Sequence, residues 1–90
     1  MQFVHLRSSK RPVEYAVMLR VLSEGRYRTI HLFDNAHEES EHHEHAYVGF
    51  EKQQPPVATW RGDWRHAMAA ALIKVEADWV DILDDWKARS

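Results

Sequence analysis

The spacing of the apolar residues changes near Asp63, from the alternation of a strand to the three- and four-residue steps of an α-helix. From that point a single apolar stripe continues almost to the end of the chain: Trp64, Met68, Ala71, Val75, Trp79, Ile82 and Trp86. Such steps place their members on one face of a helix. Asp63 follows Gly62 and suits the N-cap position, because a carboxylate accepts hydrogen bonds from the first backbone N–H groups. We therefore predict one helix from Asp63 to about residue 88.

The residues before Asp63 have the pattern of β-strands. Residues 13–22 alternate, and one side of the alternation is wholly apolar: Val13, Tyr15, Val17, Leu19 and Val21. This side is predicted to face the core. The turn signal at residues 23–25 includes Gly25, and residues 26–34 follow as a second strand. On that strand, one face is expected to carry Tyr27, Thr29, His31 and Phe33. The two strands should form an antiparallel hairpin.

Three further segments complete the expected sheet. Residues 35–41 are polar and predict a loop, and a third strand should begin at His42 or His43 and end near Phe50. A short fourth strand is expected at residues 57–60, after a segment broken by two prolines. Residues 1–12 are interpreted either as an edge strand or as a loose arm. The prediction is a single α+β domain over residues 1–90: an antiparallel sheet of three to four strands in meander order, packed against one long C-terminal helix.

The predicted helix is longer than a small sheet is wide. At ~1.5 Å per residue it would extend for about 35–40 Å. Either the helix kinks, or its distal apolar residues find another partner: Trp79, Ile82 and Trp86. A second copy of the chain is the simplest partner, so we expect a homodimer formed through this helix.

Composition limits the classes of protein to consider. The 90 residues include no cysteine, which excludes a disulfide framework and a thiolate-ligated zinc site. No segment approaches the ~20 apolar residues that span a bilayer, and the first residues do not resemble a signal peptide. A soluble, cytoplasmic protein with no membrane association is expected. No glycine-rich phosphate loop or nucleophile motif is present either.

Histidines and acids are concentrated in residues 31–50. This segment contains five of the seven histidines, together with five acidic residues and no lysine or arginine. Imidazole titrates near neutral pH and is the commonest side-chain metal ligand. On a strand, His43 and His45 point to the same side, about 6–7 Å apart at their Cα atoms. The returning strand should bring Asp34 or His37 close to them.

Three interpretations of this cluster stay open. In the first, His43 and His45 act as acid and base on RNA, Asp34 orients one ring, and Arg26 or Arg28 holds the phosphate without any cofactor. In the second, the ligands of Zn²⁺ or another divalent transition metal are His37, His43 and His45. In the third, the histidines form a solvated, acid-flanked loop without chemistry.

A short motif adds a family resemblance. The run Leu32-Phe33-Asp34-Asn35-Ala36-His37, followed by His43-Glu44-His45, resembles the signature of the TumE-type family of small toxin–antitoxin proteins and their uncharacterised relatives. The match covers about residues 30–46. The resemblance implies a compact α+β fold, a prokaryotic cytoplasmic setting, and a toxin role with an antitoxin partner. It assigns importance to Asp34, Asn35, His43 and His45, and we expect Asn35 to join Arg26 and Arg28 in binding substrate.

Overall fold

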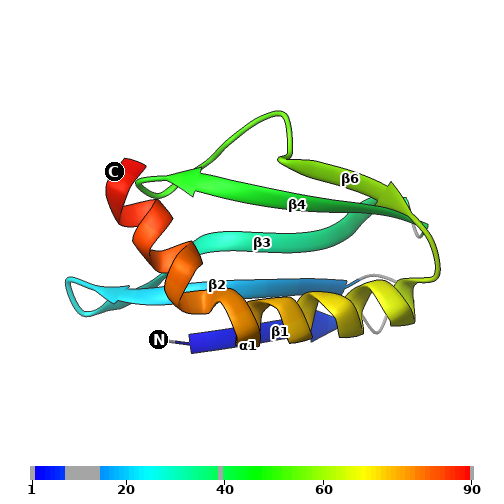
Figure 1. Ribbon diagram of the computed structural model, residues 1–90, viewed down its shortest axis with the longest axis horizontal. Coiled ribbons are helices and arrows are strands. Elements are labelled where there is room, and N and C mark those ends of the chain that lie inside the picture. Colours follow the sequence, from blue (N-terminus) through cyan, green and yellow to red (C-terminus); the bar gives the residue numbers. More distant parts are fainter. Residues whose placement is uncertain (1, 8–14, 39, 90) are drawn as a thin grey trace.

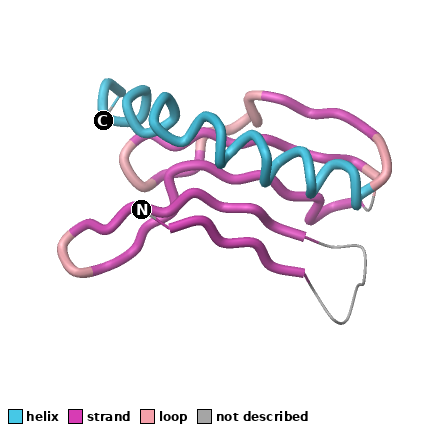
Figure 2. The backbone as a smooth tube through the Cα atoms, turned by 60° about the horizontal axis from the view of Figure 1, so that its bottom comes forward, coloured by secondary structure: helices cyan, strands magenta, loops and turns pink. Residues whose placement is uncertain are grey.

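The computed structural model describes residues 2–7, 15–38 and 40–89. Side chains are described for residues 15–35 and 40–89. Six strands precede one helix: β1 (Gln2–Arg7), β2 (Tyr15–Ser23), β3 (Arg26–Glu38), β4 (Glu41–Val48), β5 (Glu51–Lys52), β6 (Ala58–Arg61) and α1 (Trp64–Arg89). The predicted α+β class is therefore confirmed, and α1 lies over one face of the sheet (Figures 1 and 2).

The strands pair as an antiparallel meander in the order β1-β2-β3-β4-β5, and β6 pairs with β4 beside β5. Residues 1–12 were predicted as either an edge strand or a loose arm. Within them β1 is an edge strand, with Leu6 opposite Ala16 of β2. The fourth predicted strand is β6, which returns along β4 with Arg61 opposite Glu41. No helix in the described part of the chain is both long and apolar enough to cross a bilayer.

The hairpin of β2 and β3 forms at the predicted turn. Ser23 pairs with Arg26, and both residues between them have positive φ, 51° at Glu24 and 78° at Gly25. These angles match a two-residue hairpin loop, in which glycine adopts positive φ without strain.

A β-bulge interrupts the hairpin and reverses part of the predicted facing pattern. Leu19 lies opposite His31 and the next residue, Arg20, lies opposite Thr29, so Ile30 is the extra residue of β3. An inserted residue shifts the alternation on one side of the bulge. His31 and Phe33 consequently face α1, whereas Thr29 contacts Met18 on the other face. The prediction that Tyr27 and Thr29 share a face with them is wrong.

The predicted loop at residues 35–41 is also largely wrong. β3 continues to Glu38, which pairs with Glu41 of β4 across a short turn. The ladder has an irregularity between Asp34 and Glu38. Polar composition suggested a loop, but strand pairing uses backbone groups and tolerates polar side chains.

The core lies between α1 and the inner face of the sheet, the face turned toward α1. Its buried hydrophobic residues are Tyr15, Val17, Leu19, Ile30, Phe33, Ala67, Ala71 and Val75. Three of the predicted core residues of β2 are thus buried, Val21 packs against them, and Val13 lies outside the described residues. The fully buried residues of the helix are small, and its larger apolar side chains pack against the same core while partly buried: Trp64, Met68, Leu72, Trp79, Ile82, Leu83 and Trp86.

Both ends of α1 are fixed by specific contacts. Asp63 is the predicted N-cap: its Oδ1 accepts a hydrogen bond of 2.8 Å from the Arg65 backbone N–H, and this bond lowers the pKa of the Asp63 carboxyl. At the other end, Trp86 Nε1 donates to the Gly49 carbonyl at 2.6 Å. The ring centroids of Trp86 and Phe50 lie 5.8 Å apart. The helix changes direction so that its last turns reach this part of the sheet (Figure 1). The distal end of the helix therefore has a partner within its own chain.

Candidate functional site

The pairing of β3 with β4 brings three predicted site residues together. Asp34 lies opposite His43, and Leu32 lies opposite His45. Because strand side chains alternate, Asp34, His43 and His45 share the outer face of the sheet, the face turned away from α1. One potential ligand atom from each residue lies within 4.8 Å of the other two. The convergence expected from the His-x-His spacing is therefore present, with Asp34 as the third member.

Asp34, His43 and His45 are called the Asp-His-His cluster below, and their side chains lie close together. His45 Nε2 lies 3.8 Å from Asp34 Oδ1, which is too long for a direct hydrogen bond. The rings of His43 and His45 have their centroids 5.9 Å apart, at an interplanar angle of 57°. Each of the three groups is thus close enough to bind a common ion or a common substrate atom.

Burial sets the charge state favoured at His45. Its side chain is 5% exposed, and desolvation lowers the pKa of the imidazole although the carboxylate of Asp34 acts in the opposite direction. The Nδ1 atom of His45 is buried without a hydrogen-bond partner among the described residues. The same cluster affects Tyr47, whose pKa is raised by burial and then by the charge of Asp34. Neutral imidazole is the form that binds a metal ion or accepts a proton.

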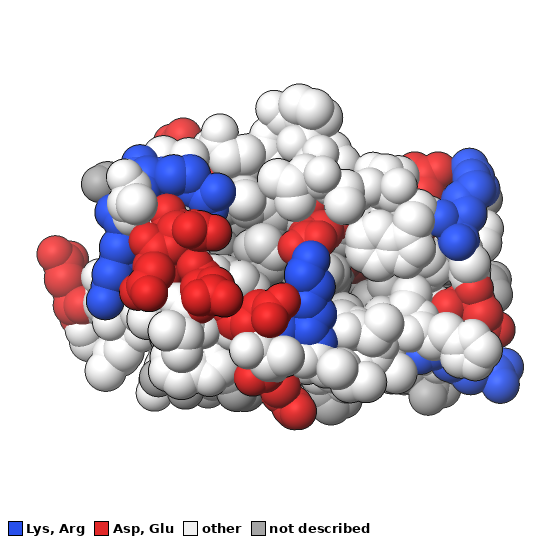
Figure 3. Space-filling model, in the orientation of Figure 1, with Lys and Arg blue, Asp and Glu red and all other residues white. Residues whose placement is uncertain are grey.

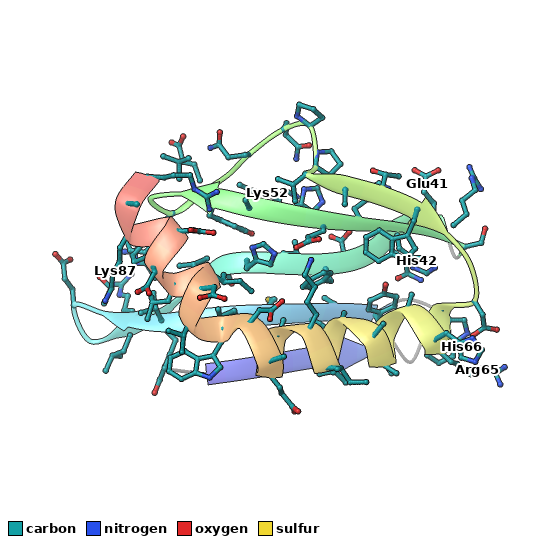
Figure 4. All side chains as sticks on the ribbon, viewed as in Figure 1. Glu41, His42, Lys52, Arg65, His66 and Lys87 are labelled. Carbon is teal, nitrogen blue, oxygen red and sulfur yellow. The ribbon has the colours of Figure 1, made fainter. Side chains whose placement is uncertain are left out.

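A chain of two hydrogen bonds connects the Asp-His-His cluster to the edge of the sheet. His43 Nε2 donates to Glu41 Oε1 at 2.9 Å, and Arg61 Nη2 donates to Glu41 Oε2 at 2.9 Å. Glu41 and Arg61 face each other because β6 pairs with the first half of β4. Figure 4 labels Glu41 at this end of β4. Neither residue was predicted from the sequence, because Glu41 was expected in a loop and the short strand at residues 57–60 had no predicted pairing partner.

The other predicted site residues do not join the cluster. Arg26 and Arg28 lie near the opposite end of β3, where Arg28 stacks 4.4 Å from the centroid of the Phe50 ring. Eight residues of strand at ~3.4 Å each separate Arg26 from Asp34, about 27 Å. Asn35 is buried on the inner side, where its Oδ1 accepts a hydrogen bond of 2.8 Å from the Tyr15 backbone N–H. The side chain of His37 lies outside the described residues.

The remaining histidines of the segment belong to polar contacts on the inner face. His31 Nε2 donates to Glu44 Oε2 at 2.7 Å, and Lys74 Nζ lies 3.1 Å from both carboxylate oxygens of Glu44. The hydrogen bond from His31 is the main cause of the lowered pKa of Glu44, which persists although burial acts in the opposite direction. Lys74 belongs to α1, so this carboxylate joins two strands to the helix.

His42 forms a second buried contact on the same face. It is fully buried, with Nε2 2.8 Å from the Gly62 carbonyl and Nδ1 2.9 Å from the Tyr15 hydroxyl. A carbonyl only accepts, so in the neutral ring Nε2 carries the proton and the Tyr15 hydroxyl donates to Nδ1. His42, labelled in Figure 4, therefore connects β2 and β4 to Gly62, just before α1.

Comparisons with known proteins return no match: no family model, no curated protein and no solved structure is similar to this chain at a significant level. The resemblance to TumE-type proteins stays a prediction based on the motif of residues 30–46.

Tyr15→Phe tests the buried contact with His42. Burial, followed by the charge of Asp34, raises the pKa of Tyr15 from 10.0 to about 12. A phenol whose pKa is raised in the folded state stabilises the fold below its unfolded pKa, and that stability is lost as the pH rises. Between pH 10 and 12 the free energy of unfolding of the wild type should therefore fall by roughly 3 kcal/mol more than that of the variant. At neutral pH the variant should be about 1–3 kcal/mol less stable, because Nδ1 of His42 loses its donor.

Urea denaturation at a series of pH values measures both effects. Tyr27→Phe removes a hydroxyl from a half-exposed side chain and is the matched control, which should keep the wild-type profile. Parallel alkaline profiles of the wild type and Tyr15→Phe would contradict the assignment.

Proposed function

We propose that the Asp-His-His cluster is the functional centre of this protein and that it binds a divalent transition-metal ion. The observation that carries the proposal is the approach of the three potential ligand atoms to within 4.8 Å of one another. Zinc binds histidine nitrogen and carboxylate oxygen at ~2.0–2.2 Å, which separates neighbouring ligand atoms by roughly 3–4 Å. Small side-chain rotations therefore suffice to close the site around an ion.

Two features of the surroundings support metal binding. A metal-ligating histidine usually donates its other ring N–H to a carboxylate or carbonyl, which orients the ring. His43 has such a hydrogen bond to a carboxylate, since its Nε2 donates to Glu41 Oε1 at 2.9 Å. At His45, burial favours the neutral imidazole that ligation needs. Two histidines and one carboxylate leave positions for water, as in hydrolytic zinc sites and non-haem iron sites.

Metal titration of the purified protein tests the proposal. Calorimetry with Zn²⁺, or the visible absorption of Co²⁺, should show one ion per chain. His45→Ala removes a ligand and should weaken binding at least about 100-fold, and Glu41→Ala should weaken it about 10–100-fold by releasing the ring of His43. His66→Ala removes an exposed histidine at the start of α1 and should leave the affinity unchanged (Figure 4). Equal affinities for the wild type and His45→Ala would reject the site.

Acid–base chemistry on RNA is the second candidate function. In this proposal the protein is a cytoplasmic toxin-like ribonuclease, neutralised by an antitoxin partner, and His43 and His45 transfer protons without a metal. The chain from Arg61 through Glu41 to His43 favours it, because a carboxylate orients a catalytic imidazole. Arg61 takes the phosphate-binding role first expected of Arg26 and Arg28. Its side chain is 63% exposed, and a guanidinium has enough donors to contact Glu41 and a phosphate together.

An RNA cleavage assay in the presence of a chelator separates the two candidates. If the histidines act without a metal, the wild type should retain full activity in the chelator. The cleavage rate of His43→Ala should be lower by about 10²–10⁴-fold. His66→Ala serves as the matched histidine control. Absence of turnover in the wild type, or equal turnover by His43→Ala, would reject the ribonuclease proposal. Activity that requires an added metal would instead assign hydrolysis to the metal centre.

A homodimer formed through α1 is also proposed, and the exposed face of this helix supports it. Ile73 and Val80 lie two helical turns apart and are 68% and 48% exposed. Acidic side chains gather over the distal part of the same helix: Asp78, Asp81, Asp84 and Asp85 (Figure 3). A second copy would cover the apolar residues, and its basic residues would balance these charges.

Light scattering at micromolar concentration should return twice the chain mass of 10.7 kDa. Ile73→Glu should return a single-chain mass, because it places a charge in the interface. Val57→Glu, at an exposed apolar residue outside α1, should not change the mass. A single-chain mass for the wild type would reject the dimer.

A further inference from the structure

A cavity of ≈ 240 Å³ lies on the helix side of the sheet, across the sheet from the Asp-His-His cluster. It is bounded by β3, β4, β6 and the first half of α1, and is lined by Phe33, Glu44, Ala58, Trp60, Ala70, Ala71 and Lys74. Pockets for drug-sized ligands occupy about 300–1,000 Å³, so this volume suits a molecule of one or two fused rings.

Small residues on two elements leave this space open. Ala70 and Ala71 of α1 face Ala58 of β6, and none of the three side chains reaches across. The larger walls are aromatic: the rings of Phe33 and Trp60 have centroids 6.5 Å apart and an interplanar angle of 72°, so they form a corner. A planar ligand can lie flat against one ring with its edge toward the other.

The polar end of the cavity consists of an ion pair. Lys74 Nζ lies 3.1 Å from both carboxylate oxygens of Glu44, and it also lies 5.7 Å from the centroid of the Phe33 ring. An anionic ligand would be repelled by the carboxylate, and a cationic ligand by the ammonium. An uncharged ligand avoids both penalties if it offers a carbonyl to Lys74 and an adjacent N–H to Glu44.

We propose that this cavity binds a planar, uncharged heterocycle with adjacent C=O and N–H groups, the edge that uracil and guanine present. The base packs in the corner of Phe33 and Trp60, its carbonyl accepts from Lys74, and its N–H donates to Glu44. Its source is either a free nucleoside or an unstacked base of single-stranded RNA, since both present the same edge. The site is separate from the Asp-His-His cluster and does not require that cluster to bind a metal.

Uridine and 3-methyluridine form a matched pair of probes, because the methyl group removes only the N–H of this edge. In ¹H–¹⁵N spectra of the wild-type protein, millimolar uridine should shift the backbone amides of Ala70, Ala71 and Lys74. 3-Methyluridine should bind at least about tenfold more weakly, since it has no N–H to donate to Glu44 and places a methyl group against the carboxylate. Absence of shifts with uridine, or equal affinities for the two probes, would overturn the proposal.

Two neighbouring alanines provide the matched variants. Ala70→Leu fills the cavity and should abolish uridine binding, whereas Ala69→Leu adds the same atoms at an exposed position that does not line the cavity and should retain it. Lys74→Met removes the ammonium of a half-exposed side chain and keeps an unbranched side chain one atom shorter; it should weaken binding at least about tenfold. Dispersed amide spectra confirm that each variant is folded. Unchanged affinity in both Ala70→Leu and Lys74→Met would show that uridine binds elsewhere.

A tetranucleotide of uridines distinguishes the two sources of the base. Tighter binding than uridine, with an affinity that falls as salt increases, would assign the cavity to RNA, because phosphate contacts are salt-dependent. Equal affinity for both would assign it to a free nucleoside. Either result supports the cavity as a base-binding site.

Discussion

The register between β3 and β4 is the constraint on which the rest of this structure depends. With Asp34 opposite His43, alternation sends His43 and His45 to the outer face and leaves His42 and Glu44 under the helix. A shift of one residue would exchange these two sets. The outer face would then lose its histidine pair, and the helix side would lose the carboxylate that Lys74 contacts.

Buried polar groups fix this register more sharply than the apolar core does. Glu44 accepts hydrogen bonds from His31 on β3 and from Lys74 on α1, and His42 contacts Tyr15 on β2. A buried polar group without a partner costs about 1–3 kcal/mol, so an alternative pairing would be penalised at several positions together. If these positions carried apolar side chains instead, the same shift in register would cost less free energy. These contacts therefore select one arrangement, whatever their net contribution to stability.

The two faces of one strand carry two kinds of chemistry. On the outer face, His43 and His45 meet Asp34 with no helix above them, so ring orientation comes from Glu41 and from the neighbouring strands. On the inner face, the alanines of α1 leave a cavity that ends in a charge pair. The sheet separates the two sites. Each can consequently be altered by substitution without direct contact with the other.

Features set by neighbouring residues were determined by the sequence alone: the helix and its N-cap at Asp63, the turn at Gly25, and the common face of His43 and His45. Local backbone geometry and side-chain periodicity are sufficient for these. The bulge at Ile30, the extension of β3 to Glu38, the inward position of Asn35 and the contact of Arg61 with Glu41 were decided only by the tertiary structure. They depend on which residue of one strand lies opposite which residue of another, and that choice reflects the packing of the whole sheet against α1.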